Sequence, residues 1–420
     1  CDWSSDVCSS DLKNLNIHVV DDDPDVLLVV KALLEDYDAN VKTSTSSKKA
    51  LGEIIEDKPD LAILDLMMPE MDGLDLCRLL RKEADLADLK IVIFSGKSYE
   101  QDQQRALSFG ADGYLTKPLI TDEFIRKLQD IVEEKVEVTY WGVRGTLPVP
   151  GEGSLRYGGN TMCTSIQFPK DNLFILDAGS GIKQLSDHLL GLQREALHAK
   201  IFISHPHWDH INALPFFVPL YIPGNEFEIF GASHGSVTMR ELISAQMDGV
   251  YFPIRIKEFA ARTYFRDLKE EEFRINDILV KTMLLSHPGT CLGYRLEYKN
   301  RSVCYITDNE LFPEGTREYN TNYWDKLTAF IRGTDILITD ATYTDEEYLK
   351  KSKWGHSAVS QVAKLAHDAE VKELHLIHHD PDQNDDAIDA KLKTAQDLLT
   401  EWKSKTRCVA PQERQSFKIT

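Results

Sequence analysis

The chain has 420 residues, a hydrophobic fraction of 42% and a formal net charge of −20. This length exceeds one ordinary hydrophobic core, so we expect two domains, and the acidic charge makes DNA or any other long phosphate backbone an unfavourable partner. No apolar stretch is long enough to span a membrane, and the seven scattered cysteines indicate free thiols in a reducing cytoplasm.

The first twelve residues, CDWSSDVCSSDL, have a composition unlike that of the remaining chain. Ser-Ser-Asp occurs twice within them, and their second half resembles a translated sequencing adapter. They lack the positively charged start and the apolar middle of a signal peptide. We therefore expect residues 1–12 to be a non-native or disordered segment, followed by one domain over residues 13–135 and another over residues 136–420.

The first of these domains alternates apolar runs with helical patterns. The runs cover residues 15–20, 61–64 and 91–94, and a fourth element ends before Pro118. Each of these elements is followed by or ends in polar residues, which are, in chain order, Asp21 and Asp22, Asp65, Ser95 and Lys117. Strands that alternate with helices predict a parallel sheet with its ligand groups at the carboxyl ends of the strands. Carboxylates, a hydroxyl and a lysine there predict a site for a divalent cation and a phosphoryl group.

This order of residues, with the motif LDLMMPEMDG at residues 64–73, resembles the receiver domain of two-component response regulators. The resemblance implies a flavodoxin-like (βα)5 fold, a phosphoacceptor at Asp65, and a sensor histidine kinase or phosphotransfer protein as partner. It assigns Mg²⁺ to Asp21, Asp22 and Asp65, and the switch and phosphoryl contacts to Ser95, Tyr114 and Lys117. A flavodoxin-like domain with a merely structural acidic cluster is the alternative.

The densest group of metal-ligand residue types follows the apolar run at residues 201–203. Within six residues the chain carries His205, His207, Asp209 and His210. In an extended chain His205 and His207 point to the same face, whereas the adjacent Asp209 and His210 point apart. Packing does not require such residues at this density, so the pattern predicts a metal site, and one with two ions rather than one.

This run matches the H-x-H-x-D-H signature and resembles the metallo-β-lactamase superfamily, whose further motifs follow in order over roughly residues 136–420. The resemblance implies an αββα sandwich, with His287 and Asp308 as the next ligands, each after an apolar run. A last histidine follows the run at residues 374–377, and strand alternation favours His378 over His379. We expect Asp177 to brace the histidine loop rather than bind metal.

The resemblance further implies two metal sites that share Asp308. The remaining ligands are His205, His207 and His287 for one ion, and Asp209, His210 and His378 for the other. Imidazole and carboxylate ligands suit Zn²⁺, and Mn²⁺ or Fe can occupy the same residues. Two such ions activate a bridging water for hydrolysis, and we expect Asp209 to orient that water as well.

The segment Trp354-Gly-His356-Ser357 precedes a predicted helix and resembles the G-H-S/T motif of the tRNase Z and cyclic-phosphodiesterase branch. In that branch the histidine lies at the metal site and stabilises the leaving group or transition state. We therefore expect His356 to be catalytic, with a purely local role at the helix start as the alternative. Because the chain lacks the long basic arm of tRNase Z, a small phosphodiester is a better candidate substrate than tRNA.

Two arginines, Arg144 and Arg156, lie in a Gly-rich stretch ahead of the histidine run. Arginines on such loops can grip a phosphate, or the stretch can be a structural hairpin, and the sequence leaves both readings open.

The sequence thus predicts a cytoplasmic response regulator whose output is a dinuclear phosphodiesterase, regulated by phosphorylation of Asp65. A lactonase or thioesterase of the same fold, or a metal-binding signalling module without turnover, are the alternatives. The substrate, the partner kinase, the sign of regulation and the oligomeric state, a homodimer included, stay open.

Overall fold

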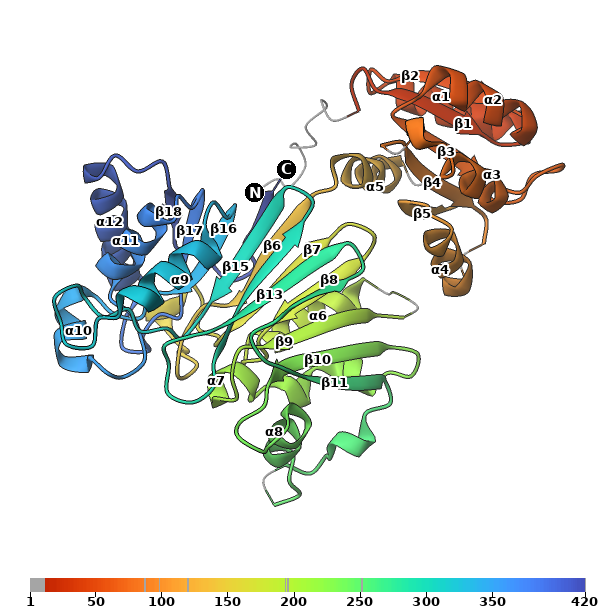
Figure 1. The fold of residues 1–420 in the computed structure, drawn as a ribbon. Coiled ribbons are helices and arrows are strands. Elements are labelled where there is room, and N and C mark those ends of the chain that lie inside the picture. The colour runs from red at the N-terminus through yellow and green to blue at the C-terminus, as the bar shows by residue number, and fades with distance from the viewer. Residues whose placement is uncertain are drawn as a thin grey trace. The chain divides into compact units, whose positions relative to one another are not determined.

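In the computed structural model the chain divides into two compact units, with the division between Lys135 and Val136 (Figure 1). The structure describes residues 12–86, 88–97, 99–118, 121–192, 194, 196–250 and 252–419. The segment predicted to be non-native or disordered therefore lies outside the described residues, except for Leu12, which is buried in the core of the first unit. Within the described part of the chain, none of the helices combines the length and apolarity that crossing a bilayer requires.

The first unit is a five-stranded parallel sheet in the order β2-β1-β3-β4-β5. Its strands are β1 (Asn16–Val20), β2 (Asn40–Ser44), β3 (Leu61–Asp65), β4 (Lys90–Ser95) and β5 (Gly113–Thr116). The helices are α1 (Pro24–Glu35), α2 (Ser47–Asp57), α3 (Gly73–Leu80), α4 (Glu100–Ser108) and α5 (Thr121–Glu133). One apolar cluster packs α1 and α5 on one face of the sheet, and another packs α2, α3 and α4 on the other face. This arrangement confirms the predicted flavodoxin-like fold.

Local sequence explains where these helices begin. Asp23, Ser46 and Asp72 each accept a hydrogen bond from a backbone N–H in the first turn of α1, α2 and α3, respectively. Such side chains satisfy donors that the helix itself leaves free. These three capping residues therefore fix the starts of the helices that follow β1, β2 and β3.

The second unit contains two seven-stranded sheets. The first has the order β11-β10-β9-β8-β7-β6-β19, and the second β12-β13-β14-β15-β16-β17-β18. The first sheet consists of β6 (Val136–Gly142), β7 (Cys163–Phe168), β8 (Asn172–Leu176), β9 (His198–Ile203), β10 (Glu226–Ala232), β11 (Arg262–Leu268) and β19 (Ser416–Ile419). The second consists of β12 (Glu272–Ile275), β13 (Ile278–Leu284), β14 (Leu292–Tyr298), β15 (Arg301–Ile306), β16 (Ile336–Asp340), β17 (Glu373–Ile377) and β18 (Arg407–Val409).

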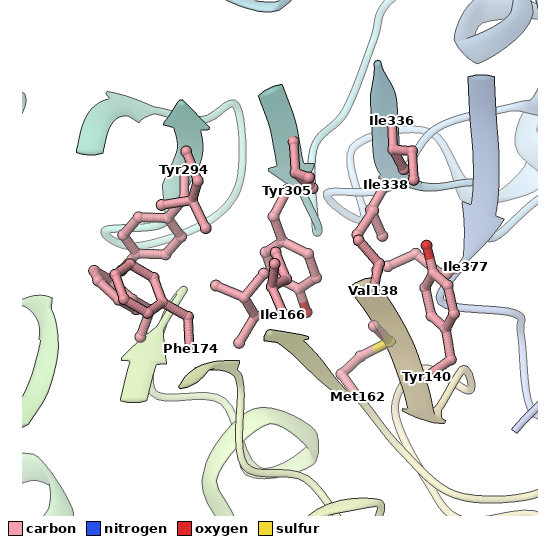
Figure 2. Packing of buried hydrophobic residues seen from close by; sticks show 14 of the residues in the cluster. Val138, Tyr140, Met162, Ile166, Phe174, Tyr294, Tyr305, Ile336, Ile338 and Ile377 are labelled. Atoms are coloured by element: carbon pink, nitrogen blue, oxygen red, sulfur yellow. The ribbon is translucent and has the colours of Figure 1, made fainter. Parts of the chain in front are cut away.

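The two sheets pack face to face over one apolar core. Figure 2 shows Val138 and Ile166 of the first sheet pointing toward Ile338 and Tyr305 of the second, and Phe174 lying beside Tyr294. Outside the first sheet, α6 (Ile182–Gly191) and α8 (Met239–Gln246) cover its other face. Helices α9 (Thr321–Ile331), α11 (Val359–Asp368) and α12 (Asp385–Glu401) cover the second sheet in the same way. The layers confirm the predicted αββα sandwich.

Three residues just beyond strand ends have a left-handed backbone. Asp177 follows β8 with φ 61°, Asp308 lies two residues after β15 with φ 40°, and His378 follows β17 with φ 58°. This backbone conformation is energetically unfavourable for residues other than glycine, and they keep it only where the surrounding structure enforces it, often at functional sites. Two of these residues, Asp308 and His378, are predicted metal ligands, and Asp177 is the residue predicted to brace the histidine loop.

Candidate metal centre and phosphoacceptor site

The seven residues predicted as metal ligands come together in two overlapping clusters. In each cluster one ligand atom from every member lies within 4.8 Å of the others. The first cluster is His205, His207, His287 and Asp308, and the second is Asp209, His210, Asp308 and His378. Because Asp308 belongs to both, the geometry suits two ions that share one carboxylate.

The clusters form where loops leave both sheets. His205 and His207 follow β9, and His207 is the N-cap of the short helix α7 (Trp208–Ile211), which carries Asp209 and His210. The remaining members follow strands of the second sheet: His287 after β13, Asp308 after β15 and His378 after β17. Each ligand thus lies in a loop or short helix that follows a strand, and the apolar core fixes the position of that strand.

The donor atoms fit a divalent transition metal. The Nε2 atoms of His205 and His210 are buried and have no hydrogen-bond partner, an arrangement that a buried polar atom does not keep without a reason. Burial lowers the pKa of His205, His207 and His287, so these imidazoles stay neutral, which is the form that binds metal. Imidazole nitrogens with carboxylate oxygens suit Zn²⁺ in particular.

Asp177 braces the histidine loop, as the sequence predicted. Its Oδ1 accepts a hydrogen bond from Ser204 N at 2.7 Å, and its Oδ2 accepts from Ser204 Oγ at 2.8 Å and Tyr305 OH at 2.7 Å. Oδ2 also lies 2.7 Å from His210 Nδ1. A proton on Nδ1 leaves Nε2 free for a metal, so Asp177 selects the ligating tautomer of His210.

The structure adds Asp340, which sequence reasoning missed, to the neighbourhood of His356. Asp340 ends β16, and its Oδ2 lies 2.8 Å from His356 Nδ1. Burial opposes a charge on the imidazole, but the carboxylates of Asp340 and Asp308 outweigh it and raise the pKa of His356 to about 9. These three residues also form a third potential ligand group with His378. His356 itself lies in a loop ahead of α11, which begins at Val359.

A second feature not foreseen from the sequence is the pair Asn309 and Glu310, directly after Asp308. The buried carboxylate of Glu310 accepts hydrogen bonds from Lys353 N at 2.6 Å and Gly355 N at 2.8 Å. Glu310 N donates to Ser286 O at 2.8 Å, next to His287, and the backbone O of Asn309 accepts a hydrogen bond from Ser357 Oγ. This pair therefore ties the loops of His287, Asp308 and His356 together.

His378, and not His379, belongs to the ligand clusters. Strand alternation is nevertheless the wrong reason, because β17 ends at Ile377 and His378 has a left-handed backbone. Thr342 Oγ1 lies 3.0 Å from His378 Nδ1, which leaves Nε2 for a metal. A Cβ on Gly145 would lie 2.2 Å from a ring carbon of His378, so only glycine fits at that position.

Both arginines of the Gly-rich stretch make hydrogen bonds or ion pairs with other parts of the second unit. Arg144 is fully buried and donates from Nε to Gly158 O at 2.9 Å, while Arg156 binds the carboxylates of Asp386 and Asp389 on α12. The structural alternative for these arginines therefore holds. Neither guanidinium is left to grip a phosphate.

In the first unit, Lys117 Nζ lies 2.7 Å from both Asp21 Oδ2 and Asp65 Oδ1. Burial raises the pKa of Asp65 even though Lys117 acts against it. The backbone N–H of Met67 donates to Asp65 Oδ2 at 2.6 Å. The predicted phosphoacceptor and its lysine thus meet at the carboxyl edge of the sheet.

The other predicted receiver residues surround this pair less tightly. Ser95 is buried at the end of β4, and Tyr114 on β5 donates from its hydroxyl to Lys97 O at 2.9 Å. Asp22 is exposed, and the compact ligand groups found among the described residues do not include Asp21, Asp22 and Asp65 together. Their assignment to Mg²⁺ stays a prediction.

Comparison with known proteins supports both halves of the chain. A family model of the response regulator receiver domain matches residues 17–129, and one of the β-lactamase superfamily domain matches residues 172–379. The response regulator MprA of Mycolicibacterium vanbaalenii is 34% identical over 118 residues, which is 28% of this chain and 50% of that protein. The chain thus spans about half the length of the named response regulators that it matches.

Solved structures resemble the second unit. The metallo-beta-lactamase fold protein YhfI of Bacillus subtilis is 16% identical with a TM-score of 0.48, covering 68% of this chain and 100% of that one. The short form of human tRNase Z is 20% identical with a TM-score of 0.46, covering 68% of this chain and 99% of that one. On the two family models and the two folds, the chain is a response regulator receiver domain joined to a domain of the β-lactamase superfamily with the metallo-β-lactamase fold.

Proposed function

We propose that the second domain is a dinuclear metal-dependent hydrolase that cleaves a small phosphodiester, such as a cyclic nucleotide. The observation that carries the proposal is the pair of ligand clusters that share Asp308, with the His356–Asp340 pair directly beside them. Two metals at such residues lower the pKa of a bound water and offset charge on the attacked phosphorus. His205, His207 and His287 would hold one ion, and Asp209, His210 and His378 the other.

The residues of the chain itself supply proton transfer and orientation. With Nδ1 held by Asp340, His356 keeps Nε2 for the substrate, and the Asp340 carboxylate raises its pKa, which favours a proton donor at this position. We assign it the role of general acid toward the leaving oxygen. Asp209, whose Oδ2 accepts from Thr146 N at 2.8 Å, would orient the attacking water.

A proton donor at His356 favours a phosphodiester with an alkoxide leaving group over a thioester. An alkoxide is a poor leaving group and gains from a proton, whereas a thiolate leaves readily without one. The acidic net charge of −20 also disfavours a long nucleic acid. Together these properties support a small substrate with a single reacting phosphodiester.

The test is a comparison of substrate classes on the metal-loaded protein. Bis-p-nitrophenyl phosphate should be hydrolysed far faster than a lactone or a thioester. A screen of cyclic nucleotides, cyclic dinucleotides and short RNA then identifies the substrate. Faster turnover of lactone or thioester would replace the proposal with one of those activities, and no turnover of any class would leave a metal-binding signalling module.

We further propose that phosphorylation of Asp65 by a sensor histidine kinase, or by a phosphotransfer protein, regulates this hydrolase. A phosphoryl group on Asp65 adds negative charge and acceptor oxygens that can recruit Lys117 and Ser95. Tyr114 lies on β5, which pairs with the strand that ends at Ser95. We expect its side chain to move when Ser95 contacts the phosphoryl group. Mg²⁺ at Asp21, Asp22 and Asp65 would offset the crowded charge.

The regulatory proposal has its own experiment. Hydrolysis rates are compared with and without beryllofluoride plus Mg²⁺, in the unmodified protein and in Asp65→Asn. A rate change that Asp65→Asn abolishes supports regulation, in either direction. Equal rates in all four conditions would show that the receiver does not control the hydrolase.

A further inference from the structure

The loops around the metal clusters carry large apolar side chains that face solvent. Trp208 is 79% exposed, Trp354 is 62% exposed and Leu147 is 59% exposed. We call these three residues the apolar rim. A large exposed aromatic residue forgoes much favourable burial, and a group of such residues around a polar site is typical of a binding surface.

Each residue of the rim is one position away from a contact within the site. Trp208 lies between His207 and Asp209 in the sequence. Trp354 precedes Gly355, whose carbonyl lies 2.9 Å from His287 Nδ1. Leu147 follows Thr146, whose backbone N–H donates to Asp209 Oδ2. Because one residue spans about 3.8 Å, all three side chains start beside the ligand clusters.

The two tryptophans are linked through the first ligand cluster. His207 Nδ1 lies 3.2 Å from His287 Nε2, and His287 in turn contacts the loop of Trp354. His207 is the exposed member of this cluster, so the rim borders the side of the site that solvent can reach. In the described part of the chain neither indole ring stacks on an aromatic ring or a cation, and both side chains are exposed.

The loops that carry the tryptophans are held in place. Glu310 accepts hydrogen bonds from the backbone on both sides of Trp354, at Lys353 N and Gly355 N. Trp208 begins α7, and its carbonyl accepts a hydrogen bond from Asn212 N at 2.7 Å. A ring on a fixed backbone loses little further freedom when it binds a ligand.

We propose that the apolar rim is a subsite for the nucleobase of a nucleoside phosphodiester whose phosphorus lies at the metal clusters. A flat base stacks on tryptophan without needing a specific hydrogen-bond pattern. The inference rests on the proposed function, since it places the reacting phosphodiester beside the rim. It narrows the substrate class from any small phosphodiester to one that carries a base.

The experiment compares two substrates that differ only in the group that does not react. Thymidine 5′-(p-nitrophenyl phosphate) and methyl p-nitrophenyl phosphate share the phosphodiester and the leaving group. The ratio of their kcat/KM values should fall about tenfold in Trp208→Ala or Trp354→Ala, from the stacking energies of single bases. Trp208→Phe keeps a flat ring and should retain most of the ratio. The control Tyr264→Ala removes an exposed ring from β11 and should leave it unchanged.

A ratio that stays the same in both tryptophan variants would overturn the subsite, because a structural role lowers both rates together. If the unmodified protein hydrolyses neither substrate, the proposed function fails and calorimetry still tests the rim. Binding of thymidine 5′-monophosphate to the metal-loaded protein should then weaken about tenfold in Trp208→Ala. Equal affinity of Trp208→Ala and the unmodified protein would refute the inference independently of turnover.

Discussion

Because Asp177 braces the histidine loop, replacing it should change both the stability of the metal-free protein and its affinity for metal, and the two effects can be measured separately. In Asp177→Asn the side chain keeps its size but has one oxygen in place of two. If the amide oxygen takes the position of Oδ2, it still accepts from Ser204 Oγ and Tyr305 OH, and the amide N–H₂ then faces Ser204 N. The amide N–H₂ and the Ser204 N–H are both donors, so this buried backbone N–H loses its acceptor.

The magnitude follows from those contacts. An unsatisfied buried N–H costs about 1–3 kcal/mol, and replacing a charged acceptor by a neutral one weakens the bond to His210 by about 1 kcal/mol. We expect the free energy of unfolding of the metal-free protein to fall by roughly 2–4 kcal/mol. Loss of the carboxylate that fixes the His210 tautomer should also weaken metal binding about 10- to 100-fold.

The assay pairs urea unfolding of the metal-free protein with Zn²⁺ titration at neutral pH. Asp335→Asn is a matched control, because Asp335 is also buried and its Oδ2 accepts from Ser302 N at 2.7 Å. Asp335 precedes β16, at the opposite end of that strand from Asp340. The control should lose stability and keep its metal affinity. Unchanged affinity for Zn²⁺ in Asp177→Asn would refute the bracing role.

Three further outcomes follow. His356→Ala should keep its metal content and lower kcat on the order of 100-fold or more, measured on a phosphodiester with an alkoxide leaving group such as a cyclic nucleotide; loss of metal would instead make it a ligand. Glu310→Gln replaces one carboxylate oxygen by an amide N–H₂, which leaves the backbone N–H of either Lys353 or Gly355 without its acceptor, so kcat should fall while metal content stays the same, and an unchanged kcat would reject the role of Glu310 in holding the His356 loop. Burial lowers the pKa of His18 in the first unit despite the nearby Glu53, so below about pH 6.5 the unfolded chain takes up the proton first and stability falls. His18→Gln should flatten that acid-side loss in urea unfolding, and an identical pH dependence would show that His18 does not cause it.

Much of the fold and of the metal centre could be predicted because the evidence is local in the chain. Apolar runs that end in His205, Asp308 or Asp65 predict strands with functional groups at their carboxyl ends. Parallel pairing of β15, β16 and β17 brings Asp308 and His378 together, and the packing of the two sheets brings His207 and His287 into one cluster. The order of the motifs, and the family that they resemble, therefore allowed most of the site residues to be predicted.

The missed residues depend on contacts that the sequence does not display. Asp340 ends an apolar run as Asp65 does, but nothing local shows that its neighbour is His356. Glu310 acts through backbone groups more than 40 positions away. His378 was chosen by strand alternation, which fails because the backbone turns left-handed there. The sequence left open whether Arg144 contacts a phosphate or belongs to a structural hairpin, and its full burial depends on contacts with distant residues.

The metal content of the intact chain tests the central claim most directly. Elemental analysis of the purified protein, reconstituted with Zn²⁺ and freed of excess ion, should give about two equivalents per chain and phosphodiester hydrolysis that rises with occupancy. Asp308→Ala removes the shared carboxylate and should lower the occupancy of both sites, whereas Asp335→Asn should retain two equivalents. A content of one equivalent or less in the unmodified protein, or full occupancy without hydrolysis of any phosphodiester, would contradict the account.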